Sequence, residues 1–313
     1  MFINTYNILT RGLADFADDL RLNEVLDKIQ PPAGTVYYVE SNVGDDTNDG
    51  LSWTNAFKTL AVAFVASNAS IALASGTGWA ARNKIYVKSD NNEAASETII
   101  TLPNKCDVIG VGSYDAKPFP EFIGNHVIGA GAYMGTRFIN VGFRSLAAGG
   151  AIFTVPTTTS GLEFIGCNFD GNSTIVGTYG IVATAIEKLK IIGCNFRGLF
   201  SVAAISLGTG SMKGMEITDN FIESGAIGIL VNSGLTCTGN IGRILRNVFS
   251  VVTLIVDENS DTLMIGDNKG ATESDGTLVL TLDYNAALCF NNMIACTSGT
   301  VSTYPILTAA IPT

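Results

Sequence analysis

The sequence predicts an all-β protein, a right-handed parallel β-helix in which short strands stack into a solenoid. The first observation is a repeat of about 26 residues. The segment LEFIGCNF at Leu162 recurs as LKIIGCNF at Leu189. Weaker copies begin at Cys106, Thr136, Met215, Gly242, Leu263 and Ala287. A repeat of this length is typical of a solenoid, because each unit can bury its apolar face only against its neighbours.

The second observation is a column of equivalent positions. Within each copy the apolar residues alternate and then shift by one, which indicates a turn between two short strands. The residue after the shift would stack about 4.8 Å from its counterpart in the next rung. This series is Val111, Val141, Cys167, Cys194, Asn220, Asn247, Asn268 and Asn292. Its first half predicts small apolar side chains, and its second half predicts an asparagine ladder with hydrogen-bonded amides.

The third observation is an alternation of charge. Four residues before the column stand Asp107, Arg137, Glu163, Lys190, Glu216 and Arg243, followed by the uncharged Met264 and Leu288. Three residues after it stand Arg144, Asp170, Arg197 and Glu223. Opposite charges on neighbouring strands stabilise a sheet and like charges destabilise it, so both series support the same register. Second strands of each coil are expected from Ala151, Tyr179, Ala203, Ile227, Thr253 and Thr277.

Residues 1–33 differ from the repeats. Residues 12–29 have apolar positions at helical spacing, and Pro31 and Pro32 end the pattern. We expect residues 1–33 to be a separate helical attachment segment, with a helix folded back on the solenoid end as the alternative. Residues 34–300 would form the β-helix, and residues 301–313, which contain two prolines, a C-terminal tail.

A cap is expected at the start of the solenoid, because the first coil would otherwise expose its apolar interior. Residues 35–41 predict a strand, and an amphipathic helix is predicted from the spacing of Phe57, Leu60, Ala61, Phe64 and Val65. The run from Tyr38 to Leu60, with DGLSW and AFKTL, resembles the entry segment of right-handed parallel β-helix proteins of the pectin-lyase-like superfamily. The resemblance extends over about residues 35–300. It implies the fold but no single activity, since that superfamily includes polysaccharide lyases, glycoside hydrolases, phage tailspikes and non-enzymatic virion proteins.

Composition narrows the classes of function. The 313 residues are 47% hydrophobic and only 15% charged, which indicates a large core and a surface partly covered by other subunits. A net charge of −10 argues against nucleic-acid binding. The sequence has no apolar run long enough for a membrane span, and its first residues carry charges where a signal peptide needs an apolar stretch. We therefore expect folding in the cytoplasm and no membrane partner.

The sequence yields candidate acidic residues but no catalytic set. Glycoside hydrolysis needs two carboxylates across the scissile bond, whereas Glu163, Glu216, Asp170 and Glu223 are expected to pair with ladder cations. Polygalacturonase-like members carry an aspartate pair together with Gly-His-Gly and Arg-Ile-Lys signatures, and this combination does not occur here. The single histidine, His126, is expected to be a loop or surface residue rather than a base.

Metal and redox chemistry are not favoured either. Asp45, Asp46, Asn48 and Asp49 lie in GDDTNDG, where a turn is favoured over a calcium site because the glutamate of a calcium hand is missing. Asp257, Glu258 and Asp261 predict a loop, near which a sugar site would be expected if one exists. The cysteines lack metal-site spacing, and Cys167 and Cys194 are expected to be reduced core residues rather than a disulfide or a reactive pair. We therefore predict no catalytic, cofactor-binding or metal-binding residue and no cofactor.

These observations favour a phage virion structural protein, either a capsid decoration protein or a spike or fibre subunit. We expect a non-enzymatic homotrimer, assembled in the host cytoplasm and located in the virion. Residues 1–33 would dock on other virion proteins, and the solenoid could contact host surface polysaccharide. The alternatives are a tailspike polysaccharide depolymerase, which would be a glycoside hydrolase or lyase, and a bacterial adhesion β-helix.

Overall fold

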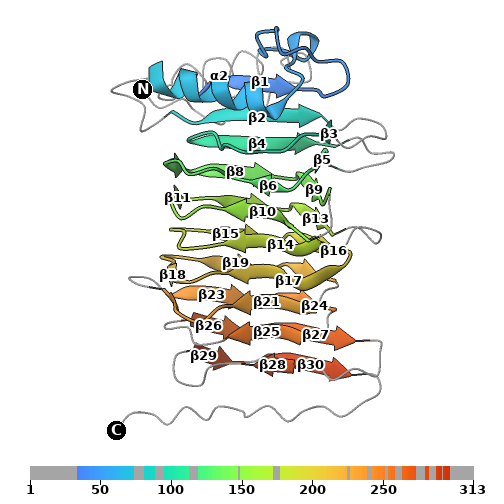
Figure 1. The fold of residues 1–313 in the computed structure, drawn as a ribbon, viewed down its shortest axis with the longest axis vertical. Coiled ribbons are helices and arrows are strands. Elements are labelled where there is room, and N and C mark those ends of the chain that lie inside the picture. The colour runs from blue at the N-terminus through green and yellow to red at the C-terminus, as the bar shows by residue number, and fades with distance from the viewer. Residues whose placement is uncertain are drawn as a thin grey trace, which may run out of the picture.

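The computed structural model describes residues 34–73, 81–88, 95–112, 119–146, 149–171, 177–223, 226–237, 241–250, 253–257, 263–272, 279–281, 287–290 and 292–296. Their strands stack rung upon rung along the long axis of the molecule (Figure 1), and their pairings are parallel. The parallel β-helix predicted from the repeats is confirmed. The expected helix in residues 1–33 and the tail 301–313 lie outside the described residues.

Three long sheets form the sides of the described solenoid. The ten-stranded sheet contains β1 (Val36–Val39), β2 (Asn83–Lys88), β4 (Cys106–Val111), β8 (Thr136–Ile139), β12 (Glu163–Ile165), β15 (Lys190–Ile192), β19 (Glu216–Thr218), β23 (Gly242–Leu245), β26 (Leu263–Gly266) and β29 (Ala287–Phe290). The nine-stranded sheet contains β3 (Ala95–Ser96), β5 (Glu121–Ile123), β9 (Gly142–Arg144), β13 (Asn168–Asp170), β16 (Asn195–Arg197), β20 (Phe221–Ile222), β24 (Val248–Phe249), β27 (Lys269–Thr272) and β30 (Met293–Cys296).

The seven-stranded sheet contains the six predicted second strands and one more, β6 (His126–Val127), which the sequence did not predict. The predicted strands are β10 (Ala151–Val155), β14 (Gly177–Ala183), β17 (Phe200–Leu207), β21 (Ile227–Val231), β25 (Thr253–Asp257) and β28 (Val279–Thr281). Two short pairs lie on the corner that leads from this sheet to the ten-stranded one. They are β7 (Tyr133–Met134) with β11 (Thr159–Ser160), and β18 (Gly210–Ser211) with β22 (Leu235–Thr236).

The register of the ten-stranded sheet matches the predicted charge series. Glu163 lies opposite Arg137 on one side and Lys190 on the other. The series continues with Asp107 opposite Arg137, Lys190 opposite Glu216, and Glu216 opposite Arg243. Lys84, opposite Asp107, extends the alternation by one rung toward the N-terminus. We call these seven residues, from Lys84 to Arg243, the charge ladder.

The asparagine ladder is also confirmed. The side-chain amide of Asn247 donates to the side-chain oxygen of Asn268 at 3.0 Å, and that of Asn268 donates to Asn292 at 2.9 Å. Cys167 and Cys194 occupy the same column, and both thiols are buried and outside any disulfide. The prediction for Val111 is wrong. Val111 is 40% exposed at the end of β4, because Gly110 does not adopt the left-handed conformation of its counterparts in later rungs, so the alternation of β4 continues and leaves Val111 facing outward.

The turn preceding this column is made by one residue per rung in the left-handed conformation. These residues are Asn140, Gly166, Gly193, Asp219, Arg246 and Asp267, with φ between 54° and 62°. Glycine, asparagine and aspartate reach this region at the lowest cost, which explains five of the six choices. Because the turn uses one residue, the inward–outward alternation shifts by one there, and the column residue that follows, such as Cys167 or Cys194, is buried. We call these six residues the turn column.

Aromatic rings fill the interior in stacked rows. Phe143 and Phe169 stack at a centroid distance of 5.3 Å, and Phe169 and Phe196 at 4.8 Å with nearly parallel planes. Phe138, Phe153 and Phe164 are also fully buried and contact this row. The row continues toward the C-terminus with Ile222 and Phe249, both fully buried, whereas Phe221 of the intervening copy is 41% exposed.

The cap consists of η3 (Trp53–Asn55) and α2 (Leu60–Leu73), and α2 lies beside β1 at the N-terminal end of the described solenoid (Figure 1). The predicted strand and helix are present, but the predicted helix face is partly wrong. The buried face is Leu60, Ala63, Phe64 and Ser67, whereas Ala61 and Val65 are exposed. Phe57 is buried before the helix starts, in an isolated bridge with Val39.

Two carboxylates hold the start of α2. Asp46 accepts from the backbone N–H groups of Lys58 and Thr59, and Glu97 accepts from those of Leu60 and Ala61. These N–H groups have no partner inside a helix, so each bond satisfies a donor that would otherwise be lost. Burial raises the pKa of Glu97, and the two backbone hydrogen bonds partly oppose that effect.

Candidate functional site

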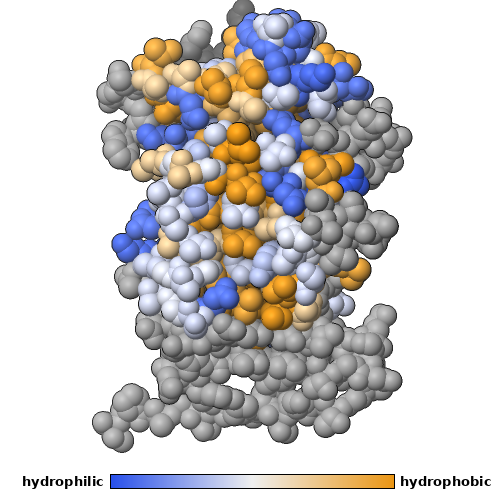
Figure 2. Space-filling view, in the orientation of Figure 1, coloured by the Kyte–Doolittle hydropathy of each residue, from blue (hydrophilic) through white to orange (hydrophobic). Residues whose placement is uncertain are grey.

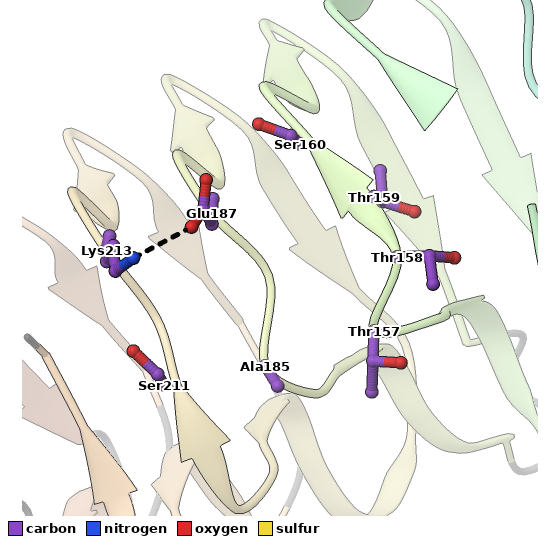
Figure 3. Close-up of a pocket in the computed structure, with 8 residues that line it drawn as sticks. All are labelled: Thr157, Thr158, Thr159, Ser160, Ala185, Glu187, Ser211 and Lys213. Carbon is purple, nitrogen blue, oxygen red and sulfur yellow. Dashed lines mark hydrogen bonds and ion pairs between the residues drawn. The ribbon is translucent and has the colours of Figure 1, made fainter. Parts of the chain in front are cut away.

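A polar groove with a volume of about 370 Å³ lies on the corner formed by β11 and β18 (Figure 3). It is lined by Thr157, Thr158, Thr159, Ser160, Ala185, Glu187, Ser211 and Lys213. Successive rungs each contribute part of the lining, because the corner segments of neighbouring coils lie side by side. Ser160 and Glu187, for example, form a parallel bridge.

The groove combines hydroxyl groups with one ion pair. Lys213 Nζ lies 3.1 Å from Glu187 Oε1, and both side chains are half exposed. Thr158 exchanges hydrogen bonds with the backbone of Gly131, whereas the Thr159 hydroxyl is buried without a hydrogen-bond partner among the described residues. Such a lining suits a ligand rich in hydroxyl groups. Glu187 is the single carboxylate among the eight lining residues, so this lining does not contain the pair required for glycoside hydrolysis.

Sequence reasoning missed this groove, although two signals mark it. Residues 157–160 read TTTS, an unusual run of hydroxyl side chains. Glu187 and Lys213 carry opposite charges and stand one repeat apart, which is the same signal that predicted the charge ladder.

Outside the groove, Asp219 and Arg246 are another pair of opposite charges one repeat apart, joined by two hydrogen bonds of 2.8 and 2.7 Å. The side chain of Arg246 lowers the pKa of Asp219.

The acidic residues of the predicted series lie next to cations. Glu163 is 3.6 Å from Lys190, and Glu223 is 3.9 Å from Arg197. Asp170 lies opposite Arg144 and Arg197 in the register of the nine-stranded sheet. These contacts are ordinary surface ion pairs that contribute modestly to stability. The expected structural role of these carboxylates is consistent with this geometry.

The carboxylates of GDDTNDG bind their own turn. Asp45 accepts from the N–H and hydroxyl of Thr47, Asp49 accepts from the N–H of Leu51, and Asp46 holds the start of α2. The Thr47 bonds lower the pKa of Asp45. Within the described ranges, no group of three or more His, Cys, Asp or Glu side chains is arranged to hold a metal ion.

His126 is not the loop or surface residue that the sequence suggested. It is the first residue of β6, fully buried against Phe143 and Phe153, with its Nδ1 accepting from the backbone N–H of Ile99. Its Nε2 has no hydrogen-bond partner among the described residues. Burial lowers its pKa to about 4. The next rung places the apolar Phe153 at the position equivalent to His126. His126 is therefore buried by its place in the repeat, which the polar residues around it in the sequence do not reveal.

The predicted loop at residues 257–261 is described only in part. Asp257 ends β25 opposite Val231, whereas Glu258 and Asp261 lie outside the described residues. In the described part of the chain, no helix is long and apolar enough to cross a membrane.

A second candidate surface lies on the outer face of the ten-stranded sheet. Two residues after each of the seven ladder charges, and two after Val36 in β1, comes an uncharged side chain on the outer side of the sheet, and the register aligns these eight into one column. We call it the apolar stripe: Tyr38, Tyr86, Ile109, Ile139, Ile165, Ile192, Thr218 and Leu245. Apart from the buried Thr218, its members are half-buried. Reading the position two residues after each ladder charge would have found it in the sequence.

The face over the seven-stranded sheet is also poor in charge. Figure 2 shows mainly white and orange residues along its middle. The outward column there is Val127, Thr154, Val182, Ser206 and Leu230. The apolar stripe differs from this column in lying directly beside a regular series of alternating charges.

Comparisons with known proteins add little. No family model and no curated protein matches the chain. Two solved structures are similar to it, both of GH136 lacto-N-biosidase from Eubacterium ramulus. The selenomethionine derivative has 11% identity and a TM-score of 0.29, with 92% of this chain and 72% of that chain covered. The native protein has 9% identity and a TM-score of 0.25, with 91% and 69% covered. Similarity at this level carries no argument about activity, so the fold assignment rests on the strand pairing itself.

Proposed function

We propose that this protein is a phage virion structural protein, a capsid decoration or spike subunit whose β-helix serves as a rigid rod. The observation that carries the proposal is the continuity of the side-chain ladders. Asparagines and phenylalanines link neighbouring rungs inside the described solenoid, and alternating charges link them on its surface. The polar side chains of these ladders stabilise the rod, as suits a scaffold exposed outside a cell.

Self-association and attachment complete the proposal. The long uncharged stripe on the ten-stranded sheet is a surface of the kind that another subunit covers. The resemblance noted in the sequence suggests a homotrimer, and residues 1–33 would attach the rod to other virion proteins. Host surface polysaccharide is a suitable ligand for the hydroxyl-lined groove.

The proposal is tested on particles. Phage particles made by a host that carries the gene are purified, and the protein is sought by mass spectrometry and by immunogold electron microscopy. We expect the protein in the purified particles, with label at a repeated position. Protein found only in the soluble fraction of the lysate, with none in the particles, would overturn the proposal.

The polar groove supports a second candidate, a polysaccharide depolymerase, because hydroxyl groups and the Glu187–Lys213 pair converge there. The purified full chain is incubated with host capsule or lipopolysaccharide, and new reducing ends and unsaturated products are measured. The structural proposal expects no turnover. Turnover lost in Glu187→Gln, or on mutation of Asp257 or Glu258, would favour the depolymerase. Glu223→Gln, which removes an equally exposed paired carboxylate elsewhere, is the control.

A further inference from the structure

We infer that the outer face of the ten-stranded sheet binds a second copy of this chain, face to face and antiparallel, about a two-fold axis between β8 and β12. The inference goes beyond the proposed function: it does not rest on the virion role, and it assigns the apolar stripe to an antiparallel dimer in place of the homotrimer that the resemblance suggests. It depends on the apolar stripe, the charge ladder and the turn column, whose positions follow from the strand register.

The apolar stripe is long enough to serve as an interface. Its eight rungs, spaced about 4.8 Å apart, extend about 34 Å along the solenoid. Four isoleucines occupy its centre, from Ile109 to Ile192. The charge ladder borders the stripe on one side and the turn column borders it on the other, so a partner lying on the stripe also meets one of these two columns.

An antiparallel partner brings ladder against ladder. With the two-fold axis between β8 and β12, the eight rungs of the stripe overlap completely, and Ile139 of one copy meets Ile165 of the other. The same axis places Arg137 opposite Glu163, Asp107 opposite Lys190 and Lys84 opposite Glu216. Each of these contacts joins opposite charges, and the remaining pair joins Arg243 to the uncharged Val36. An axis passing through a rung would instead place like charges together, which is unfavourable.

A parallel partner is disfavoured by the same columns. If two copies pack stripe on stripe with their rungs level, the ladder of one faces the turn column of the other. At the level of β19 and β23, Glu216 would then face Asp219 and Arg243 would face Arg246. Like charges across an interface are destabilising and suppress that arrangement. The alternation of sign therefore selects the antiparallel pair.

The first test measures mass. Sedimentation of the full chain over a range of concentrations should show a dimer that dissociates on dilution, and more readily at high salt because ion pairs contribute. Ile165→Lys, at the centre of the stripe, should shift the midpoint of dimerisation to at least tenfold higher concentration. Val127→Lys, on the exposed column of the seven-stranded sheet, is the control and should leave it unchanged. A monomer at all concentrations, or a trimer, would overturn the inference.

The second test reads orientation. Ile109 of one copy lies opposite Ile192 of the other in the antiparallel pair, whereas in a level parallel pair each residue lies near its own counterpart. Variants Ile109→Cys and Ile192→Cys are therefore treated with a short bifunctional maleimide, alone and mixed. We expect cross-linked dimer in the mixture and little in either variant alone. Efficient cross-linking of each variant by itself would show a parallel pair and refute the antiparallel one.

Discussion

The side-chain oxygen of Asn247 accepts two hydrogen bonds from Asn220, one from its backbone N–H at 3.1 Å and one from its side-chain amide at 2.9 Å. Asn247 in turn donates to Asn268 and to the backbone carbonyl of Ile217. Both asparagines are almost fully buried. Each amide therefore satisfies polar groups on two rungs, which is why a polar residue is stable in this interior column.

Replacing Asn247 with alanine should be strongly destabilising. The change leaves the two donors of Asn220 and the carbonyl of Ile217 without their partner, and each buried unsatisfied group costs about 1–3 kcal/mol. We expect the free energy of unfolding to fall by about 3 kcal/mol or more in urea denaturation. Asn195→Ala is the matched control, because the Asn195 side-chain oxygen is buried without a hydrogen-bond partner among the described residues. Equal losses in the two variants would contradict the ladder.

Reversing one charge of the ladder should cost less. Glu163→Lys places three cations in a row with Arg137 and Lys190, and we expect a loss of about 1 kcal/mol. Adding Lys190→Glu restores one opposite pair and should recover part of the loss. If the double variant were no more stable than the single one, ion pairing between neighbouring charges of the ladder would not contribute to stability.

Burial of His126 should make stability depend on pH. Its pKa in the folded chain is about 4, against 6.5 in the unfolded chain, so the unfolded chain takes up the proton first as the pH falls. The contribution of neutral His126 to the free energy of unfolding is present above pH 6.5 and is lost between pH 6.5 and about 4. The whole contribution is about 3 kcal/mol. His126→Gln, which keeps an acceptor for the N–H of Ile99, should flatten this part of the profile. An unchanged profile would assign the dependence to other groups.

Removal of residues 1–33 should leave the β-helix folded. These residues share nothing with the repeats, and both β1 and the cap made by η3 and α2 come after them in the chain. A chain starting at Gly34 is expected to keep the circular-dichroism signal of β-sheet and to melt within a few degrees of the full chain. Failure of the shortened chain to fold would show that residues 1–33 are part of the cap.

The sequence alone determined the solenoid and its register, because a β-helix repeats the same local contacts in every rung. Alternation of apolar residues marks the inward face, and the asparagine and charge series fix which rung positions are neighbours. Glu163 could therefore be placed between Arg137 and Lys190 from spacing alone.

Only the tertiary structure decided features that break the repeat or combine several columns. His126 is buried because its rung places it in the phenylalanine core, and Val111 is exposed because β4 continues without the left-handed turn residue of later rungs. The groove at Glu187 and Lys213 and the apolar stripe arise where side chains from successive coils meet on one surface. Residue spacing in the sequence marks these columns, but only the stacking of rungs brings them together into one groove or one face.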